Sequence, residues 1–201
     1  GVIYVITMEN TTHATLLARL AEGVDPAAWR EFHDRYADLL RGFTRRYGLQ
    51  AADSDDATQE ILLSLAKSVG KFQYDPAKGK FRSYLKTVAV HTVFRILRQK
   101  KGAQVLDLTG EEADNAAVDP SIETWWEDEW RRYHVRRAMR RLESEFNEQD
   151  RMAFSQYAVN GRPASETAAE LGLSVDQVYQ AKSRILKRLS VLIAEQIEEE
   201  G

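Results

Sequence analysis

The sequence has 201 residues, 43% of them hydrophobic and 29% charged, with a formal net charge of -3. These proportions are those of a soluble globular protein of one or two domains, and they exclude a chain that is disordered throughout. There is no cysteine and the four histidines are scattered, so we expect no disulfide, no metal and no cofactor. The apolar opening GVIYVIT is too short to span a membrane and no cleavage pattern follows it, which indicates a cytoplasmic protein without membrane insertion.

Helical periodicity dominates the first half of the chain, and no strand pattern appears there. Apolar residues recur at three- and four-residue steps from Trp29 to Tyr47 and are predicted to form a core stripe. Asp53 and Ser54 are predicted to cap the third helix. The expected helices run from about Thr12 to Ala21, from Asp25 to just before Gly48, from Asp53 to Gly70, and from Phe81 to about Lys101.

The composition changes abruptly after residue 101, because acidic residues then occur from Gly102 to Glu129 without one lysine or arginine. This pattern predicts a linker. It ends in WWEDEW, whose three tryptophans carry more apolar surface than a free linker exposes without cost, so we expect them to dock on another surface.

The second half returns to helical periodicity, with Val135, Met139, Leu142 and Phe146 on one predicted buried face. The sequence therefore predicts an all-α protein of two small helical domains joined by an acidic linker. Its predicted divisions are an N-terminal tail (1-11), a first domain (12-101), the linker (102-130), a second domain (131-195) and an acidic tail (196-201).

The stretch ETAAELGLSVDQVYQAKSR, from Glu166 to Arg184, is typical of a helix-turn-helix. Gly172 permits the tight turn, and Ser174 with Gln177 three residues later predicts a capping box. Glutamine, lysine and arginine can reach base edges in a major groove. A plain helical hairpin with a solvated polar face is the alternative. The expected buried face is Val175, Val178, Ile185 and Leu189, and the outward residues are Gln177, Tyr179, Gln180, Lys182, Ser183, Arg184 and Lys187.

A basic segment from Lys78 to Lys101 contains no acidic residue and includes or lies beside four aromatic residues. Basic and acidic residues are therefore concentrated in different segments, which the negative net charge does not show. Cations that track phosphates beside aromatics that stack on bases are typical of a single-strand binding surface. Phe81 and Tyr84 are equally compatible with a core role, whereas Tyr74 favours function. No catalytic constellation or phosphate-binding glycine loop stands out, so we expect a binding protein and not an enzyme.

These motifs resemble, in order and spacing, the sigma-70 family of bacterial transcription initiation factors, specifically the two-domain extracytoplasmic-function (ECF) type. The resemblance runs from about Leu16 to Leu192. DSDDATQEILLSLAKS is similar to region 2.2, KFQYDPAKGKFRSYLKTVAVHTVFRILRQKK to regions 2.3 and 2.4, and GRPASETAAELGLSVDQVYQAKSRILKRL to region 4.2.

The resemblance implies an alternative sigma factor that binds core RNA polymerase, through the beta-prime clamp helices and the beta flap, together with promoter DNA; an anti-sigma factor is left open. The implied polymerase-binding residues are Asp56, Gln59 and Glu60. Those for recognition and melting of the minus-10 element are Tyr74, Lys80, Phe81, Arg82, Tyr84, Lys86, His91 and Arg95, and the outward residues of the second helix of the helix-turn-helix would read the minus-35 element.

Four positions depart from the usual family pattern. Val90 and His91 stand where an arginine-asparagine pair is usual, Thr167 where a larger aliphatic residue is common, and Tyr179 where a basic residue is frequent. The resemblance also implies that the linker threads toward the polymerase active-site cleft, where its acids would mimic nucleic acid. Two alternatives stay open. One is a stand-alone helix-turn-helix regulator whose first domain senses a ligand or dimerises, and the other is a protein-interaction module whose WWEDEW segment and arginine-rich helix dock a partner.

Overall fold

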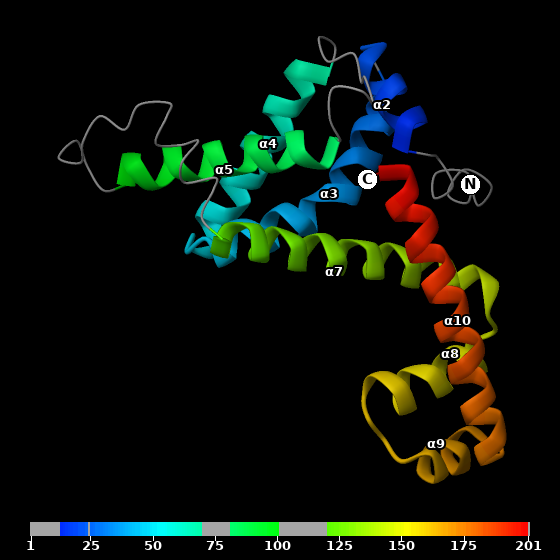
Figure 1. Cartoon of the computed structure of the whole chain (residues 1–201). Coiled ribbons are helices and arrows are strands. Elements are labelled where there is room, and N and C mark those ends of the chain that lie inside the picture. The colour runs from blue at the N-terminus through cyan, green and yellow to red at the C-terminus, as the bar shows by residue number, and fades with distance from the viewer. Residues whose placement is uncertain (1–12, 24, 70–80, 101–119, 201) are drawn as a thin grey trace. The chain divides into compact units, whose positions relative to one another are not determined.

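The computed structural model describes residues 13-23, 25-69, 81-100 and 120-200, and every regular element within them is a helix (Figure 1). This confirms the predicted all-α fold class. The chain divides into two compact units: unit 1 comprises residues 1-133 and 199-201, and unit 2 comprises residues 134-198. Each unit has its own buried core.

Unit 1 is built from α2 (His13–Ala21), α3 (Pro26–Arg46), α4 (Ala51–Val69), α5 (Phe81–Lys100) and the first part of α7 (Pro120–Glu145). Helix α3 begins as predicted, because the Asp25 carboxylate accepts hydrogen bonds from the backbone N–H groups of Ala27 and Ala28, each 3.0 Å long. After α3 the chain turns at Gly48, whose φ of 99° lies in the left-handed region that glycine tolerates.

The predicted apolar stripe of α3 forms the centre of the unit 1 core, with Phe32, Tyr36, Leu39, Leu40 and Phe43 all fully buried. Trp126 of α7 packs edge-on against Phe43 with ring centroids 5.2 Å apart, and Trp130 stacks on Trp126 at 6.3 Å. Aromatic pairs in these geometries add about 0.5–1.5 kcal/mol each beyond the area they bury. The tryptophans of the WWEDEW segment therefore dock inside the chain itself.

This docking corrects the predicted linker at its C-terminal end. Residues 120-130 were expected to be linker but are helical and form the first part of α7. Pro120 occupies the first helical position, where its missing N–H costs no hydrogen bond. Burial of Ile122, Trp126 and Trp130 offsets the entropy lost on ordering this stretch. Residues 102-119 of the predicted linker lie outside the described residues.

Helices α7 and α3 approach closely at Gly42, which lies one turn before the end of α3. A Cβ atom added there would lie 2.6 Å from Glu129 Cδ, closer than real Cβ contacts come. The Glu129 side chain is 3% exposed, and its carboxylate pairs with Arg46 Nε at 2.9 Å and with Arg132 Nη1 at 3.2 Å. The missing side chain at position 42 thus makes room for a buried, paired carboxylate.

The predicted cap of the third helix is wrong, because α4 begins at Ala51 and both proposed capping residues lie inside its first turn. Ser54 is buried, with its Oγ 2.7 Å from Thr44 Oγ1 of α3. Asp53 instead forms an ion pair with Lys100 at the end of α5. Both polar side chains have tertiary partners, which local capping rules do not anticipate.

Unit 2 contains the remainder of α7, α8 (Glu148–Phe154), a π-helical turn η2 (Ser155–Val159), α9 (Ala164–Leu171) and most of α10 (Val175–Glu200). Its larger core cluster joins Ala138 and Leu142 of α7 to Phe154, Ile185 and Leu192. Asn147 caps α8 by accepting a 2.8 Å hydrogen bond from the Asp150 backbone N–H.

Two residues predicted to be buried in the second half are exposed. Val135 is 42% exposed, since the buried side of this part of α7 carries His134 and Ala138. His134 Nδ1 lies 3.2 Å from the Gln196 side-chain amide, so a polar pair occupies the place where periodicity predicts an apolar contact. Val175 is 37% exposed because it is the first residue of α10 and extends beyond the core.

Candidate nucleic-acid interface

Helices α9 and α10 form the predicted helix-turn-helix. Gly172 closes α9 in the left-handed conformation, with φ 65° and ψ 32°, and Leu173 N–H donates to Ala168 O at 2.9 Å. The predicted capping box is confirmed in both directions. Ser174 N–H donates to Gln177 Oε1 at 2.8 Å, and Gln177 N–H donates to Ser174 Oγ at 3.1 Å.

Small side chains fix α10 against the rest of this motif. Val178 and Ala181 are fully buried against Ala153, Ala164 and Ala168, which lets the helices approach closely. Thr167 is also fully buried, and its Oγ1 has no hydrogen-bond partner among the described residues. The departure noted at position 167 thus places an unpaired hydroxyl in the core of the motif.

The predicted outward face of α10 is exposed, apart from Lys182, which is half-buried with its Nζ 5.0 Å above the ring of Tyr157. Tyr157, from η2, also packs edge-on against Tyr179 at 5.5 Å. It was missed by the sequence reasoning, because only the tertiary fold brings η2 beside α10. Arg184 Nη2 donates to both carboxylate oxygens of Asp150 in α8 at 3.0 Å, which leaves its Nη1 and Nε groups for other partners.

The residues predicted to contact the minus-10 element do not form one surface. Arg82 and His91 are nine residues apart, as are Lys86 and Arg95, and nine residues make two and a half helical turns. Arg82 and Lys86 therefore lie on one side of α5, and His91 and Arg95 lie on the opposite side. Arg82 and Lys86 form ion pairs with α7, whereas Arg95 forms one with Glu60 of α4.

The aromatic members of this set have structural surroundings. Phe81 is fully buried and contacts the rings of Phe32 and Tyr36, so the structure supports its core role and corrects the expectation that it traps a base. Tyr84 is half-buried, and its hydroxyl donates to Ser68 Oγ of α4 at 2.6 Å. Tyr74 and Lys80 lie outside the described residues.

Arg82 is the most enclosed cation of the α5 set. It forms an ion pair with Glu127, and its guanidinium lies 5.3 Å from the ring centroid of Trp130. Burial lowers the pKa of Arg82, while the nearby Glu123 carboxylate raises it. An arginine side chain stays protonated at neutral pH under such shifts, so the side chain remains a cation.

The predicted polymerase-binding residues share one exposed stripe on α4. Asp56, Gln59 and Glu60 are all exposed, while Ala57 and Ile61 between and beside them are buried. Leu63 continues the stripe one turn further and is 60% exposed. The sequence reasoning missed Leu63, although its spacing of seven residues from Asp56 places it on the same face.

The first half of the chain matches a family model. Residues 32–103 match the model described as Sigma-70 region 2. The chain is 28% identical over 185 residues to "ECF RNA polymerase sigma factor SigM" of Mycobacterium tuberculosis (strain ATCC 35801 / TMC 107 / Erdman), covering 90% of this chain and 85% of that protein. Residues 32–103 are therefore similar to region 2 of the sigma-70 family. The SigM protein of strain ATCC 25618 / H37Rv is 28% identical over 183 residues, covering 90% and 84%.

A solved structure, "Structure of CnrH in complex with the cytosolic domain of CnrY", matches this chain at 20% identity and a TM-score of 0.35, covering 90% of this chain and 96% of that one. The Sigma-70 region 2 match contains α4, α5 and most of α3. It therefore includes the predicted polymerase-binding stripe and both sides of α5, whereas the helix-turn-helix lies outside it.

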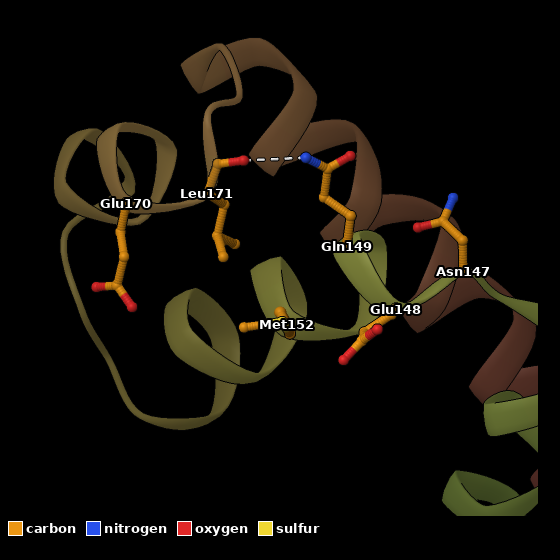
Figure 2. A pocket seen from close by; sticks show the side chains of 6 residues that line it. All are labelled: Asn147, Glu148, Gln149, Met152, Glu170 and Leu171. Atoms are coloured by element: carbon orange, nitrogen blue, oxygen red, sulfur yellow. Dashed lines mark hydrogen bonds between the residues drawn. The ribbon is translucent and has the colours of Figure 1, made fainter.

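Unit 2 also contains a shallow polar pocket of about 550 Å³, lined by Asn147, Glu148, Gln149, Met152, Glu170 and Leu171 (Figure 2). Gln149 crosses one side of it and donates to Leu171 O at 2.9 Å. The lining combines two carboxylates with amide and apolar side chains and no basic group. Among the described residues no cluster of potential ligands could hold a metal ion, and no helix is long and apolar enough to cross a membrane.

Proposed function

We propose that the chain is an alternative sigma factor, the subunit that directs core RNA polymerase to a promoter and helps to open it. The observation that carries this proposal is the α9–α10 helix-turn-helix, with its reciprocal capping box and exposed polar face, in a chain whose residues 32–103 match Sigma-70 region 2. The outward residues of α10 would read the minus-35 duplex in the major groove. Polymerase would perform the chemistry, and no catalytic residue is assigned to the chain.

The α4 stripe is the proposed contact with the beta-prime clamp helices. Asp56, Gln59 and Glu60 offer two carboxylates and an amide on one exposed face, and Leu63 adds an exposed apolar side chain beside them. Interfaces commonly combine apolar anchors with a polar rim. We include Leu63 in the proposed interface on this ground, together with the three residues implied by the resemblance.

Promoter opening is assigned to α5 and the segment before it. Tyr74 and Lys80 would meet unstacked bases and phosphates there, with Arg82 and Lys86 as further cations. Flipping a base out of the stack costs a few kcal/mol, and stacking on an aromatic side chain returns roughly 1–3 kcal/mol per base. Contacts with the upstream duplex and with core polymerase would offset the remainder. Phe81 would support this surface from the core.

In-vitro transcription with core polymerase on a genomic promoter library tests the proposal. Promoter-specific transcripts are expected, together with weak promoter binding by the chain alone. A tight footprint without polymerase would identify a stand-alone helix-turn-helix regulator. No footprint in either condition would favour the protein-interaction module, although Trp126 and Trp130 are buried within unit 1 and are unavailable to a partner in this state.

Arg184→Ala should weaken discrimination at one minus-35 position by about 1–3 kcal/mol if Arg184 reads a base there. The first control is Asp150→Asn, which removes the ion pair with Arg184 but keeps the Arg184 side chain. Arg140→Ala removes an exposed arginine of α7 and is the charge-matched control. Loss of discrimination in the Arg140 variant equal to that in the Arg184 variant would contradict base reading. Tyr74→Ala should impair opening, scored with a permanganate footprint, while duplex binding is retained.

A further inference from the structure

Helix α7 carries two carboxylates spaced to match two cations of α5. Lys86 Nζ lies 2.5 Å from Glu123 Oε2, and Arg82 forms an ion pair with Glu127. Each pair of like-charged residues is four apart in sequence, so each lies on one face of its helix. Lys86, the later of the two α5 residues, pairs with Glu123, the earlier of the two α7 residues. The two helices therefore run antiparallel along this contact.

The first part of α7 is held in place by groups other than these carboxylates. Trp126 and Trp130 are buried in the unit 1 core, and Glu129 occupies the space left by Gly42 beside Arg46. These contacts anchor the helix whether or not Glu123 and Glu127 are charged. The position of the two carboxylates over α5 is therefore fixed by the core and does not depend on the ion pairs themselves.

The two carboxylates differ from Glu129 in their contact with solvent. Glu123 is 49% exposed and Glu127 35% exposed, whereas Glu129 is 3% exposed. Their partners Arg82 and Lys86 are 22% and 24% exposed, so both ion pairs are partly open to solvent and a competing anion can reach them at a smaller cost than a buried pair. Breaking the Glu129 pairs would instead leave a buried charge without its partners.

We propose that Glu123 and Glu127 mask the α5 cations Arg82 and Lys86, so that the phosphates of single-stranded promoter DNA must displace two carboxylates of α7 to bind there. A carboxylate and a phosphate both accept hydrogen bonds from the same guanidinium and ammonium donors. This masking lowers the affinity of the chain for every single strand. Only strands that make additional contacts with the protein then bind stably. This inference rests on the proposed role of α5 in binding the opened promoter.

The test measures binding of a short fluorescein-labelled single-stranded oligonucleotide of mixed sequence to the full chain, alone and assembled with core polymerase. Glu123→Gln with Glu127→Gln should raise affinity about threefold to tenfold, as expected for two partly exposed ion pairs. The slope of log affinity against log salt should steepen by roughly 0.7 for each cation released to a phosphate. Asp128→Asn removes a third α7 carboxylate, which pairs with Arg46, and should change affinity less than twofold with an unchanged slope.

Four outcomes are decisive. Equal affinity and slope in the double glutamine variant and in Asp128→Asn would overturn masking, because only a general charge effect would remain. Weaker binding by the double variant would also overturn it and would make the carboxylates positioning residues for the cations. Arg82→Gln with Lys86→Gln separates the two ideas: if this variant binds like wild type, the proposed use of these cations in promoter opening fails. If it binds more weakly while the glutamate variants match their control, masking alone fails.

Discussion

Gly42→Ala provides a direct test of the packing between α7 and α3. In the interior of a helix this substitution ordinarily stabilises a protein by about 0.5–1 kcal/mol, because alanine loses less backbone entropy than glycine. Here we expect the opposite sign. The new Cβ would lie 2.6 Å from Glu129 Cδ, and the carboxylate that must move is 3% exposed and paired with Arg46.

The expected magnitude follows from two opposing terms. Overpacking of a well-packed site costs typically 1–3 kcal/mol. The gain in helix propensity offsets about 0.5–1 kcal/mol of that cost. We therefore expect the free energy of unfolding of unit 1 to fall, by up to roughly 2.5 kcal/mol.

Intrinsic fluorescence during urea unfolding isolates this effect, since all four tryptophans, Trp29, Trp125, Trp126 and Trp130, lie in unit 1. In a Glu129→Ala background the obstacle is absent, and Gly42→Ala should then stabilise by about 0.5–1 kcal/mol. A double-mutant cycle gives the coupling between the two positions. Stabilisation by Gly42→Ala in the wild-type background would refute the close approach of the two helices.

The remaining predictions concern unit 2 and are followed by amide hydrogen exchange, because that unit contains no tryptophan. Ser174→Ala removes one hydrogen bond of the capping box and should cost about 1 kcal/mol, with faster exchange in the first turn of α10; Ser165→Ala, an exposed serine of α9, should be neutral. Thr167→Val should stabilise by about 1 kcal/mol, because it removes a buried unpaired hydroxyl; a loss of stability would reveal a partner for that hydroxyl. The pKa of Glu145 is lowered chiefly by its hydrogen bond from Arg188, so its stabilisation is present above the ordinary glutamate pKa and is lost as the pH falls through the lower folded value. The stability difference between wild type and Arg188→Gln should therefore be largest near neutral pH and shrink in acid; a difference independent of pH would contradict this.

Local sequence rules predicted features whose causes lie within one or two helical turns. The start of α3 at Asp25 and Pro26, the apolar stripe of α3 and the Ser174–Gln177 capping box are confirmed in the structure. Each depends on side chains three or four residues apart, which the helical repeat places together in any helix of that sequence. The all-α fold class follows from the same periodicity.

Contacts between helices were decided only by the tertiary structure. Periodicity could not show that Arg82 and Lys86 face α7 while Arg95 faces α4, because the sequence of α5 does not specify its neighbours. Ser54 has the residue type of a helix cap, yet burial against Thr44 gives it another partner. Residues 120-130 read locally as linker, and they are helical because Trp126 packs against Phe43, which lies 83 residues earlier in the chain. The sequence by itself determined most of the helices and which residue types they present. Long-range packing, whose free energy depends on residues distant in sequence, decided which of those side chains meet and extended α7 back to Pro120.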